Sequence, residues 1–195
     1  EGDIFWRPNG STGEFRALRF AIQNTEGITI ESLTVLPDGS VLGNTRQYNG
    51  FFRYFPQTGK LDYFGKHGPS GVKTAIADGK VWFCGYPNVN LSVYDPAQPW
   101  TSTGKAATPA AAAGMNPALV GYFGQGTTEA HHCQALLAPG NGRIYICGHR
   151  ERWSTGTGLG YYEIATKKKF GLGAANKEIE PVACIAVPGM ERIVF

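Results

Sequence analysis

Short apolar runs separated by tight polar turns recur along the chain. Three stretches share one pattern, an apolar strand, a turn with Asp-Gly or Asn-Gly, and a second apolar strand ending near glycine: 32–44, 72–87 and 133–149. A fourth copy begins in 182–195. Because Asp-Gly and Asn-Gly accept positive φ at both central residues, each stretch predicts a β-hairpin closed by a two-residue turn.

A second pattern follows these hairpins. Aromatic-rich strands with Pro, Thr, Gly and Lys turns occupy 50–65, 90–100 and 158–171, and the opening residues 2–18 match them. The two patterns together make four-stranded units spaced by roughly 40 to 50 residues, as in β-propeller blades. We therefore expect an all-β fold, a propeller of four-stranded antiparallel blades. The rival β-sandwich does not predict that the same four strands recur in order.

The repeat divides this single domain into blade parts and one insertion. The blade parts are 1–18, 19–66, 67–100, 129–175 and 178–195, and the insertion loop is 101–128. They amount to about four blades, which leaves two arrangements open. One is a closed four-bladed ring, and the other, which we favour, is part of a larger propeller completed by further blades.

The insertion carries its own predictions. Its stretch "NPALVGYFG" (116–124) predicts a short helix with proline in the first turn. Because a long insertion often covers a site, and this one leads into His131, we expect it to act as a lid.

Composition and charge narrow the classes of partner. Apolar residues make up 42% of the 195 residues, which is typical of a globular protein. A net charge of +3 gives no reason to expect nucleic acid or a membrane surface as partner. No apolar run approaches the roughly 18 residues that a membrane span needs. The chain starts with glutamate and shows no signal-peptide pattern, so its compartment stays open.

All four cysteines lie in apolar runs, and none belongs to a CxxC pair: Cys84, Cys133, Cys147 and Cys184. A cysteine in such a run behaves as a small hydrophobic residue, so we expect buried thiols. A disulfide between neighbouring strands stays open.

Two stretches resemble a known group of proteins. "FRYFPQTGKL" (52–61) and "YDPAQPW" (94–100) are similar to the outer strands of quinoprotein-like, NHL and YVTN-type propellers. The resemblance covers nearly the whole chain and implies an architecture. It implies no particular activity.

Polar residues gather where strands begin or end. His131 and His132 begin the first strand of the third hairpin, and His149 and Arg150 follow its second strand. A hairpin brings these two ends together, so we expect one rim of the propeller channel to carry them. The corresponding places in the other units hold Asn44, Arg46, Lys73 and Tyr86. Such a rim suits an anionic or sugar-like ligand, a polysaccharide or a small molecule.

One reading of this rim is acid–base catalysis. His132 or His149 would abstract a proton, Arg150 or Arg46 would neutralise a carboxylate, and Tyr86 would donate a proton. Tyr161 is the alternative proton donor. This set resembles, in residue types and placement, the sites of propeller polysaccharide lyases such as ulvan and oligogalacturonate lyases. The resemblance implies β-elimination across a uronic acid by a secreted protein, extracellular or periplasmic.

A second reading is a metal site. His131 or His132 with His149, and Cys133 beside them, offers ligands of the kind that zinc takes. Adjacent residues of a strand point to opposite faces, so only one of the paired histidines would serve.

Further readings stay open. Strand ends at a rim are normally polar, so the loop at 149–152 is equally well explained as a solvated segment. The propeller would then be a non-catalytic scaffold for protein–protein interaction. A redox cofactor of the quinoprotein kind is another possibility. Trp153 is a candidate for stacking on sugar.

Overall fold

The structure is a computed structural model that describes the residues 2–7, 12–20, 30–45, 50–65, 71–102, 108–124, 128, 130–150, 158–172, 183–187 and 192–194. For 2–6, 18–20, 71, 72 and 150 it describes the backbone alone. The regular elements in these ranges are β-strands, and their pairings are antiparallel. The expected all-β fold is confirmed.

The strands form five sheets in chain order. Sheet A pairs β1 (Gly2–Trp6) with β2 (Arg16–Phe20). Sheet B holds β3 (Ile30–Val35), β4 (Val41–Thr45), β5 (Phe51–Phe55) and β6 (Lys60–Gly65). Sheet C holds β7 (Gly71–Ala77), β8 (Lys80–Gly85), β9 (Asn90–Tyr94) and β10 (Ala118–Tyr122). Sheet D holds β11 (Ala130–Leu137), β12 (Arg143–Arg150), β13 (Leu159–Glu163) and β14 (Lys168–Gly171). Sheet E pairs β15 (Ile185–Ala186) with β16 (Ile193–Val194).

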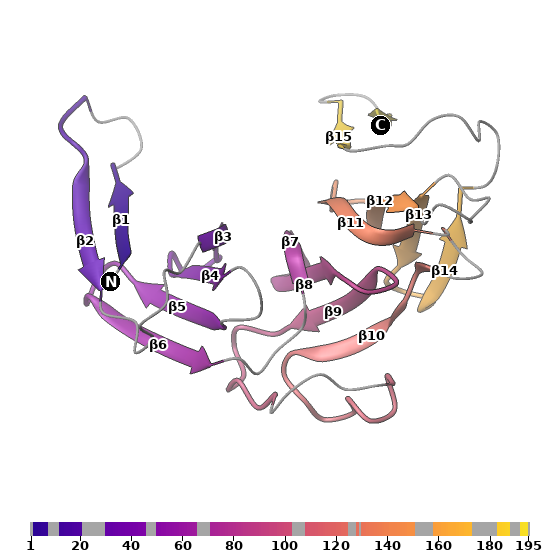
Figure 1. Cartoon of the computed structure of the whole chain (residues 1–195), viewed down its shortest axis with the longest axis horizontal. Coiled ribbons are helices and arrows are strands. Elements are labelled where there is room, and N and C mark those ends of the chain that lie inside the picture. The colour runs from indigo at the N-terminus through magenta and orange to yellow at the C-terminus, as the bar shows by residue number, and fades with distance from the viewer. Residues whose placement is uncertain are drawn as a thin grey trace.

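The sheets follow one another along an open arc (Figure 1). In this view β3, β7 and β11 lie on the inner side of the arc, and β6, β10 and β14 lie on its outer side. Contacts join the first strands of neighbouring sheets, β3 with β7 and β7 with β11. The hydroxyl oxygens of Thr34 and Thr74 hydrogen-bond between β3 and β7 at 2.6 Å. Sheets B, C and D therefore adjoin along their first strands.

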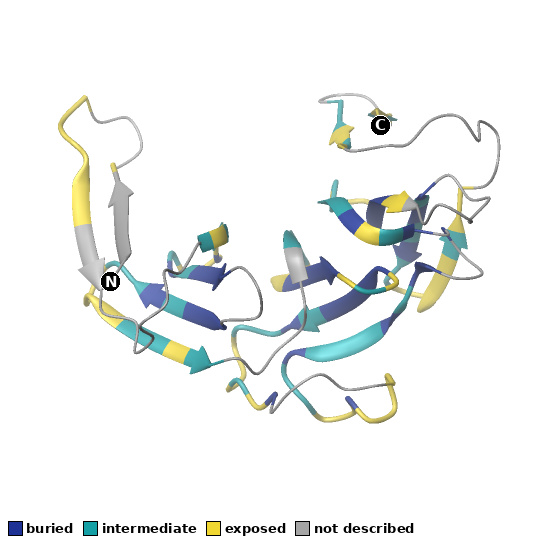
Figure 2. Ribbon diagram, viewed as in Figure 1, coloured by how far each residue is buried: buried dark blue, intermediate teal, exposed yellow. Residues whose placement is uncertain are grey.

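Strand β8 is buried on both faces because sheet C is packed between sheets B and D. Side chains alternate along a strand. Val81 and Phe83 accordingly belong to the apolar cluster shared with sheet B, and Trp82 and Cys84 to the cluster shared with sheet D. Figure 2 shows the same pattern, with the middle strands largely buried and the outer strands more exposed. The continuous apolar run "VWFC" is the sequence pattern of a strand covered on both faces.

The hairpin turns differ from the expected form. Both residues of the Asp78–Gly79 turn have positive φ, at 51° and 70°, which is the expected two-residue turn. In the first hairpin only Gly39 of the Asp38–Gly39 pair has positive φ, and Leu36 N bonds to Ser40 O across a longer loop. In the third, the positive φ angles belong to Gly140 and Gly142. The prediction of a two-residue turn is right for the second hairpin and wrong for the other two.

The helix expected in 116–124 is wrong. Residues 118–122 form β10, which pairs with β9 and supplies the fourth strand of sheet C. Ala118 lies opposite Val93, and Tyr122 lies opposite Asn90. The edge of β9 lacks a partner until this distant segment pairs with it, and this pairing overrides the local helical pattern. No helix in the described ranges is long and apolar enough to cross a bilayer.

Candidate functional site

The β11–β12 hairpin brings two of the predicted histidines opposite one another. The register pairs His132 with His149, and their ring centroids lie 6.4 Å apart. Both side chains are exposed, whereas the next residues into the strands, Cys133 and Gly148, lie in the packed part of the sheet. The hairpin therefore holds both imidazoles at its open end.

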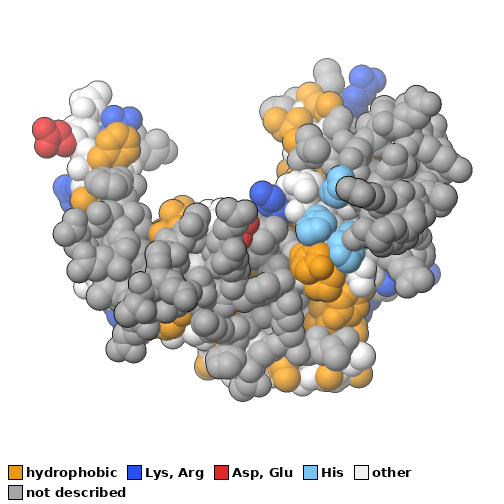
Figure 3. All heavy atoms as spheres, viewed as in Figure 1, with side chains coloured by type: hydrophobic (Ala, Val, Ile, Leu, Met, Phe, Trp, Pro, Cys, Tyr) orange, Lys and Arg blue, Asp and Glu red, His pale blue; other side chains and the backbone are white. Residues whose placement is uncertain are grey.

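Tyr86 reaches this hairpin from the neighbouring sheet. It directly follows β8, and its ring stacks on that of His132 with centroids 4.6 Å apart and planes at 24°. The ring of His131 meets it edge-on at 4.7 Å. Tyr86 is 40% exposed, so solvent and solutes reach it despite these contacts. We call Tyr86, His131, His132 and His149 the histidine–tyrosine cluster. Figure 3 shows the histidine side chains gathered on one face, beside hydrophobic side chains.

The loop that carries Tyr86 is held in an unusual backbone conformation. Asn88 and Val89 have positive φ, at 55° and 48°, which is costly for a β-branched residue. Backbone bonds hold the loop, since Val89 N donates to His131 O at 3.3 Å and Gly124 N donates to Asn88 O at 2.9 Å. The Val89 side chain is fully buried. Burial and hydrogen bonds on two sides offset the strain and fix the loop against β11.

Asn88 also fixes one imidazole. Its Oδ1 lies 3.2 Å from Nδ1 of His131. An amide oxygen only accepts, so Nδ1 of His131 is the donor, and in the neutral ring Nε2 is then the acceptor. Sequence reasoning missed Asn88. The available signal was an asparagine just after a strand, a residue type that tolerates positive φ.

The segment before β11 is tied down by Thr128. This residue is buried, its hydroxyl donates to Phe123 O at 2.5 Å, and it accepts from Ala130 N at 3.2 Å. Thr128 thereby links the end of the β10 region to the start of β11, which carries His131 and His132.

The other predicted site residues lie elsewhere or outside the description. Asn44 is buried and accepts a hydrogen bond from the Ser32 hydroxyl, so it is a packed group inside sheet B. Lys73 lies on β7 opposite Cys84. Arg150 pairs with Ala130 through its backbone, and its side chain lies outside the described part of the structure. Arg46 and Trp153 lie outside the described residues altogether.

Tyr161 belongs to a different surface. Its ring stacks on Phe170 at 4.7 Å, and the guanidinium of Arg143 lies 4.7 Å from its centroid. These residues come from β12, β13 and β14. The ring of Tyr145 also contacts that of Tyr161, with centroids 5.5 Å apart. The aromatic side chains therefore contact one another in a row across sheet D. The structure does not bring Tyr161 into the histidine–tyrosine cluster.

The described residues offer no ligand set for zinc. Nowhere in the described ranges do three or more His, Cys, Asp or Glu side chains gather so as to hold a metal ion. His131 and His132 interact with Asn88 and Tyr86. What this arrangement offers a ligand is a set of rings and imidazole nitrogens on one exposed surface.

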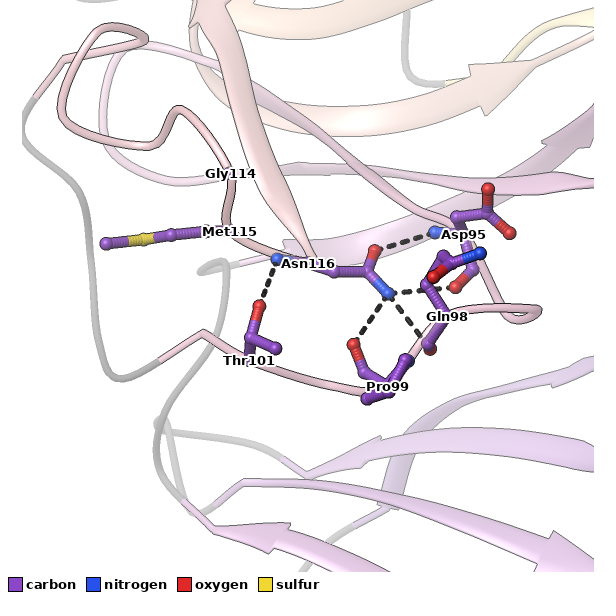
Figure 4. Close-up of a pocket in the computed structure, with 7 residues that line it drawn as sticks. All are labelled: Asp95, Gln98, Pro99, Thr101, Gly114, Met115 and Asn116. Carbon is purple, nitrogen blue, oxygen red and sulfur yellow. Dashed lines mark hydrogen bonds between the residues drawn. The ribbon is translucent and has the colours of Figure 1, made fainter.

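A pocket of about 300 Å³ lies apart from the cluster, at the turn after β9. Asn116 is one of the residues that line it, and Figure 4 shows its amide nitrogen directed at the carbonyl oxygens of Asp95, Gln98 and Pro99. The three distances are 2.9, 3.1 and 3.0 Å, and its Oδ1 accepts from Asp95 N at 2.8 Å. Both ends of the amide are satisfied by backbone. Asn116 thus fixes the turn and the entry to β10.

In comparisons with known proteins, no protein-family model matches the chain, and no curated protein matches it.

Proposed function

We propose that this chain forms consecutive blades of a β-propeller and binds an anionic carbohydrate at the histidine–tyrosine cluster. Two features support the propeller. Sheets B, C and D repeat the same four-strand meander, and neighbouring sheets contact each other along their first strands. This is the relation between adjacent blades around a central channel. Solving the structure of the full-length polypeptide tests it, because the first strands of all sheets should then surround one axis.

The proposed ligand class rests on one observation, the stack of Tyr86 on His132 with centroids 4.6 Å apart. Exposed aromatic rings bind the apolar faces of sugar rings. Imidazoles beside such a ring supply hydrogen bonds to hydroxyls and, when protonated, a positive charge for a carboxylate. A uronic-acid saccharide has an apolar ring face, hydroxyl groups and a carboxylate. A neutral sugar lacks the carboxylate, so the uronic-acid saccharide matches the cluster better.

The binding experiment compares an oligogalacturonate with a neutral oligosaccharide of equal length by isothermal titration calorimetry. We expect the unmodified chain to bind the acidic saccharide more tightly, and His132→Ala to weaken that binding by about tenfold. Tyr63→Ala is the matched control, because Tyr63 is an exposed aromatic residue on β6, outside the cluster. Equal affinity for the two saccharides, or an equal loss in the control, would contradict the proposal.

Catalysis by β-elimination is the second candidate, favoured by the phenol of Tyr86 lying beside two imidazoles. In this reaction an imidazole removes the proton at C5 of the uronate, a C4–C5 double bond forms, and the C4–O4 bond breaks. Tyr86 would protonate the leaving oxygen. The unsaturated product absorbs ultraviolet light, which gives the assay.

The double variant His132→Ala, His149→Ala tests the lyase. It should lose the ultraviolet signal, and a variant that degrades uronic-acid polymers as fast as the parent would rule out the lyase. Binding without turnover in the parent would leave a carbohydrate-binding propeller. If the parent neither binds nor degrades uronic-acid polymers, the remaining functional class is favoured, a non-catalytic scaffold whose blades present loops to another protein.

A further inference from the structure

The four cysteines differ in burial and in what their thiols contact. Cys84 of β8 and Cys133 of β11 belong to the apolar cluster between sheets C and D, 0% and 3% exposed. Cys147 lies on β12, and Cys184 lies directly before β15. All four thiols are free, and only Cys184 is partly exposed. The expectation of buried thiols is confirmed for Cys84, Cys133 and Cys147, and it is wrong for Cys184.

Cys147 faces sheet E. Ile144 and Ile146 point into the cluster shared with sheet C, so alternation along β12 turns Cys147 to the opposite face. Its thiol donates to the carbonyl oxygen of Ala183 at 3.7 Å, next to Cys184 in the chain. This contact places the Cys147 thiol of sheet D beside the backbone that leads into Cys184 and sheet E.

Burial makes the two thiols unequal, because Cys147 is buried and Cys184 is partly exposed. The neighbouring thiol of Cys184 and burial both raise the pKa of Cys147. A thiolate is the nucleophilic form of cysteine and burial disfavours it, so the partly exposed Cys184 is the more reactive member of the pair.

We propose that Cys184 and Cys147 form a redox-active site that exchanges with a small-molecule disulfide such as oxidised glutathione. The Cys184 thiolate attacks one sulfur of that disulfide, its S–S bond breaks, and one glutathione thiolate leaves. Cys147 loses its proton and attacks Sγ of Cys184 in the mixed disulfide, and the second glutathione thiolate leaves. Two protein thiols are oxidised to one disulfide, one disulfide is reduced to two thiols, and the protons pass to the departing thiolates.

The other pair lacks these properties. Cys84 and Cys133 are buried between two sheets, and burial raises the pKa of Cys84. An external disulfide cannot reach them without separating sheets C and D. Metal binding does not account for the cysteines either, because no three of them, nor any three His, Cys, Asp or Glu in the described residues, form a metal-holding group.

Oxidation would tie sheet E covalently to sheet D. Cys147 precedes His149 by two residues on β12, so the bond would form close to the histidine–tyrosine cluster. The proposal stands on the cysteines alone and does not depend on the carbohydrate proposal.

The test incubates the full chain with oxidised glutathione and maps the products by mass spectrometry. We expect a mass loss of two hydrogen atoms and a peptide that links Cys147 to Cys184. Cys147→Ser should stop the reaction at a glutathione adduct on Cys184, and Cys184→Ser should prevent it. The matched controls Cys84→Ser and Cys133→Ser should still form the Cys147–Cys184 bond.

Alkylation rates give a second readout that does not depend on disulfide formation. With iodoacetamide at neutral pH, Cys184 should react at least about tenfold faster than each of the other cysteines in the folded chain. A disulfide between Cys84 and Cys133 instead, a stable glutathione adduct with Cys147 intact, or a Cys184 that reacts no faster than the buried thiols would overturn the proposal.

Discussion

The ring of Tyr86 stacks on the ring of His132, with centroids 4.6 Å apart, although the two residues belong to different sheets. Tyr86 follows the second strand of sheet C, and His132 lies in the first strand of sheet D. The contact therefore depends on how sheets C and D pack. It places a phenol beside imidazoles at the open end of the β11–β12 hairpin.

Replacing Tyr86 separates the role of its ring from that of its hydroxyl. Tyr86→Phe keeps the stack, so affinity for a uronic-acid oligosaccharide should stay within about threefold of the parent, whereas Tyr86→Ala should weaken it by about tenfold. Isothermal titration calorimetry measures both. If elimination occurs, Tyr86→Phe should abolish it while binding persists. Equal losses of affinity in the two variants would show that the ring does not act by stacking.

Gly158 should be far less replaceable than Gly140, although both have positive φ, at 72° and 88°. A Cβ on Gly158 would overlap the carbonyl oxygen of Gly148, whereas one on Gly140 would meet nothing within 4 Å. We expect Gly140→Ala to lower the free energy of unfolding by about 1 kcal/mol and Gly158→Ala by about 3 kcal/mol or more. Urea denaturation compares them. Equal costs would mean that the backbones of residues 148 and 158 do not approach closely.

Asn116 should be needed for the turn after β9. Asn116→Asp replaces its amide nitrogen with an oxygen that would face three carbonyl oxygens, so we expect a loss of about 3 kcal/mol in the free energy of unfolding. Thr101→Val is the control, because it removes one hydrogen bond to Asn116 N and should cost about 1 kcal/mol. Thermal unfolding followed by circular dichroism measures both. If Thr101→Val lowered the free energy of unfolding as much as Asn116→Asp does, this role of Asn116 would be contradicted.

Arg53 joins sheet B to the turn that follows β9. Its guanidinium donates to Ser40 Oγ at 2.8 Å, to Pro96 O at 2.9 Å and to Asp38 at 2.5 Å, and its side chain is 11% exposed. Arg53→Ala should therefore lower the free energy of unfolding by about 2 to 3 kcal/mol at pH 7, measured by urea denaturation. Asp62→Asn, which removes an ion pair on exposed β6, should cost less than about 1 kcal/mol.

The Asp38 partner predicts a dependence on pH. Burial raises the pKa of Asp38, but hydrogen bonds from Ser40 and the hydrogen bond and charge of Arg53 outweigh it and lower the pKa overall. Because the pKa of Asp38 is lower in the folded state, its ionised carboxylate stabilises the fold at pH values above its unfolded-state pKa of about 4. This stabilisation is lost as the pH falls through the folded-state pKa. Because Asp38 is 49% exposed, we expect less than about 1 kcal/mol. The difference between parent and Asp38→Asn in urea denaturation should shrink from pH 7 to pH 3, and a difference that grows would contradict it.

The sequence determined the local elements of this protein. Alternating apolar runs and Gly-containing turns predicted the hairpins, and the apolar runs around Cys84, Cys133 and Cys147 predicted buried thiols. The pairing of His132 with His149 followed from the hairpin, since a turn brings together residues that are near in sequence.

Tertiary structure decided what depends on packing between distant segments. Residues 118–122 form a strand because the edge of β9 lacks a partner, and the local sequence says nothing of that edge. Asn88 and Val89 keep positive φ only because β11 and the end of β10 hold them. The stack of Tyr86 on His132 likewise depends on how sheets C and D pack. No sequence pattern encodes such contacts, because they join residues whose own preferences are satisfied in many other arrangements.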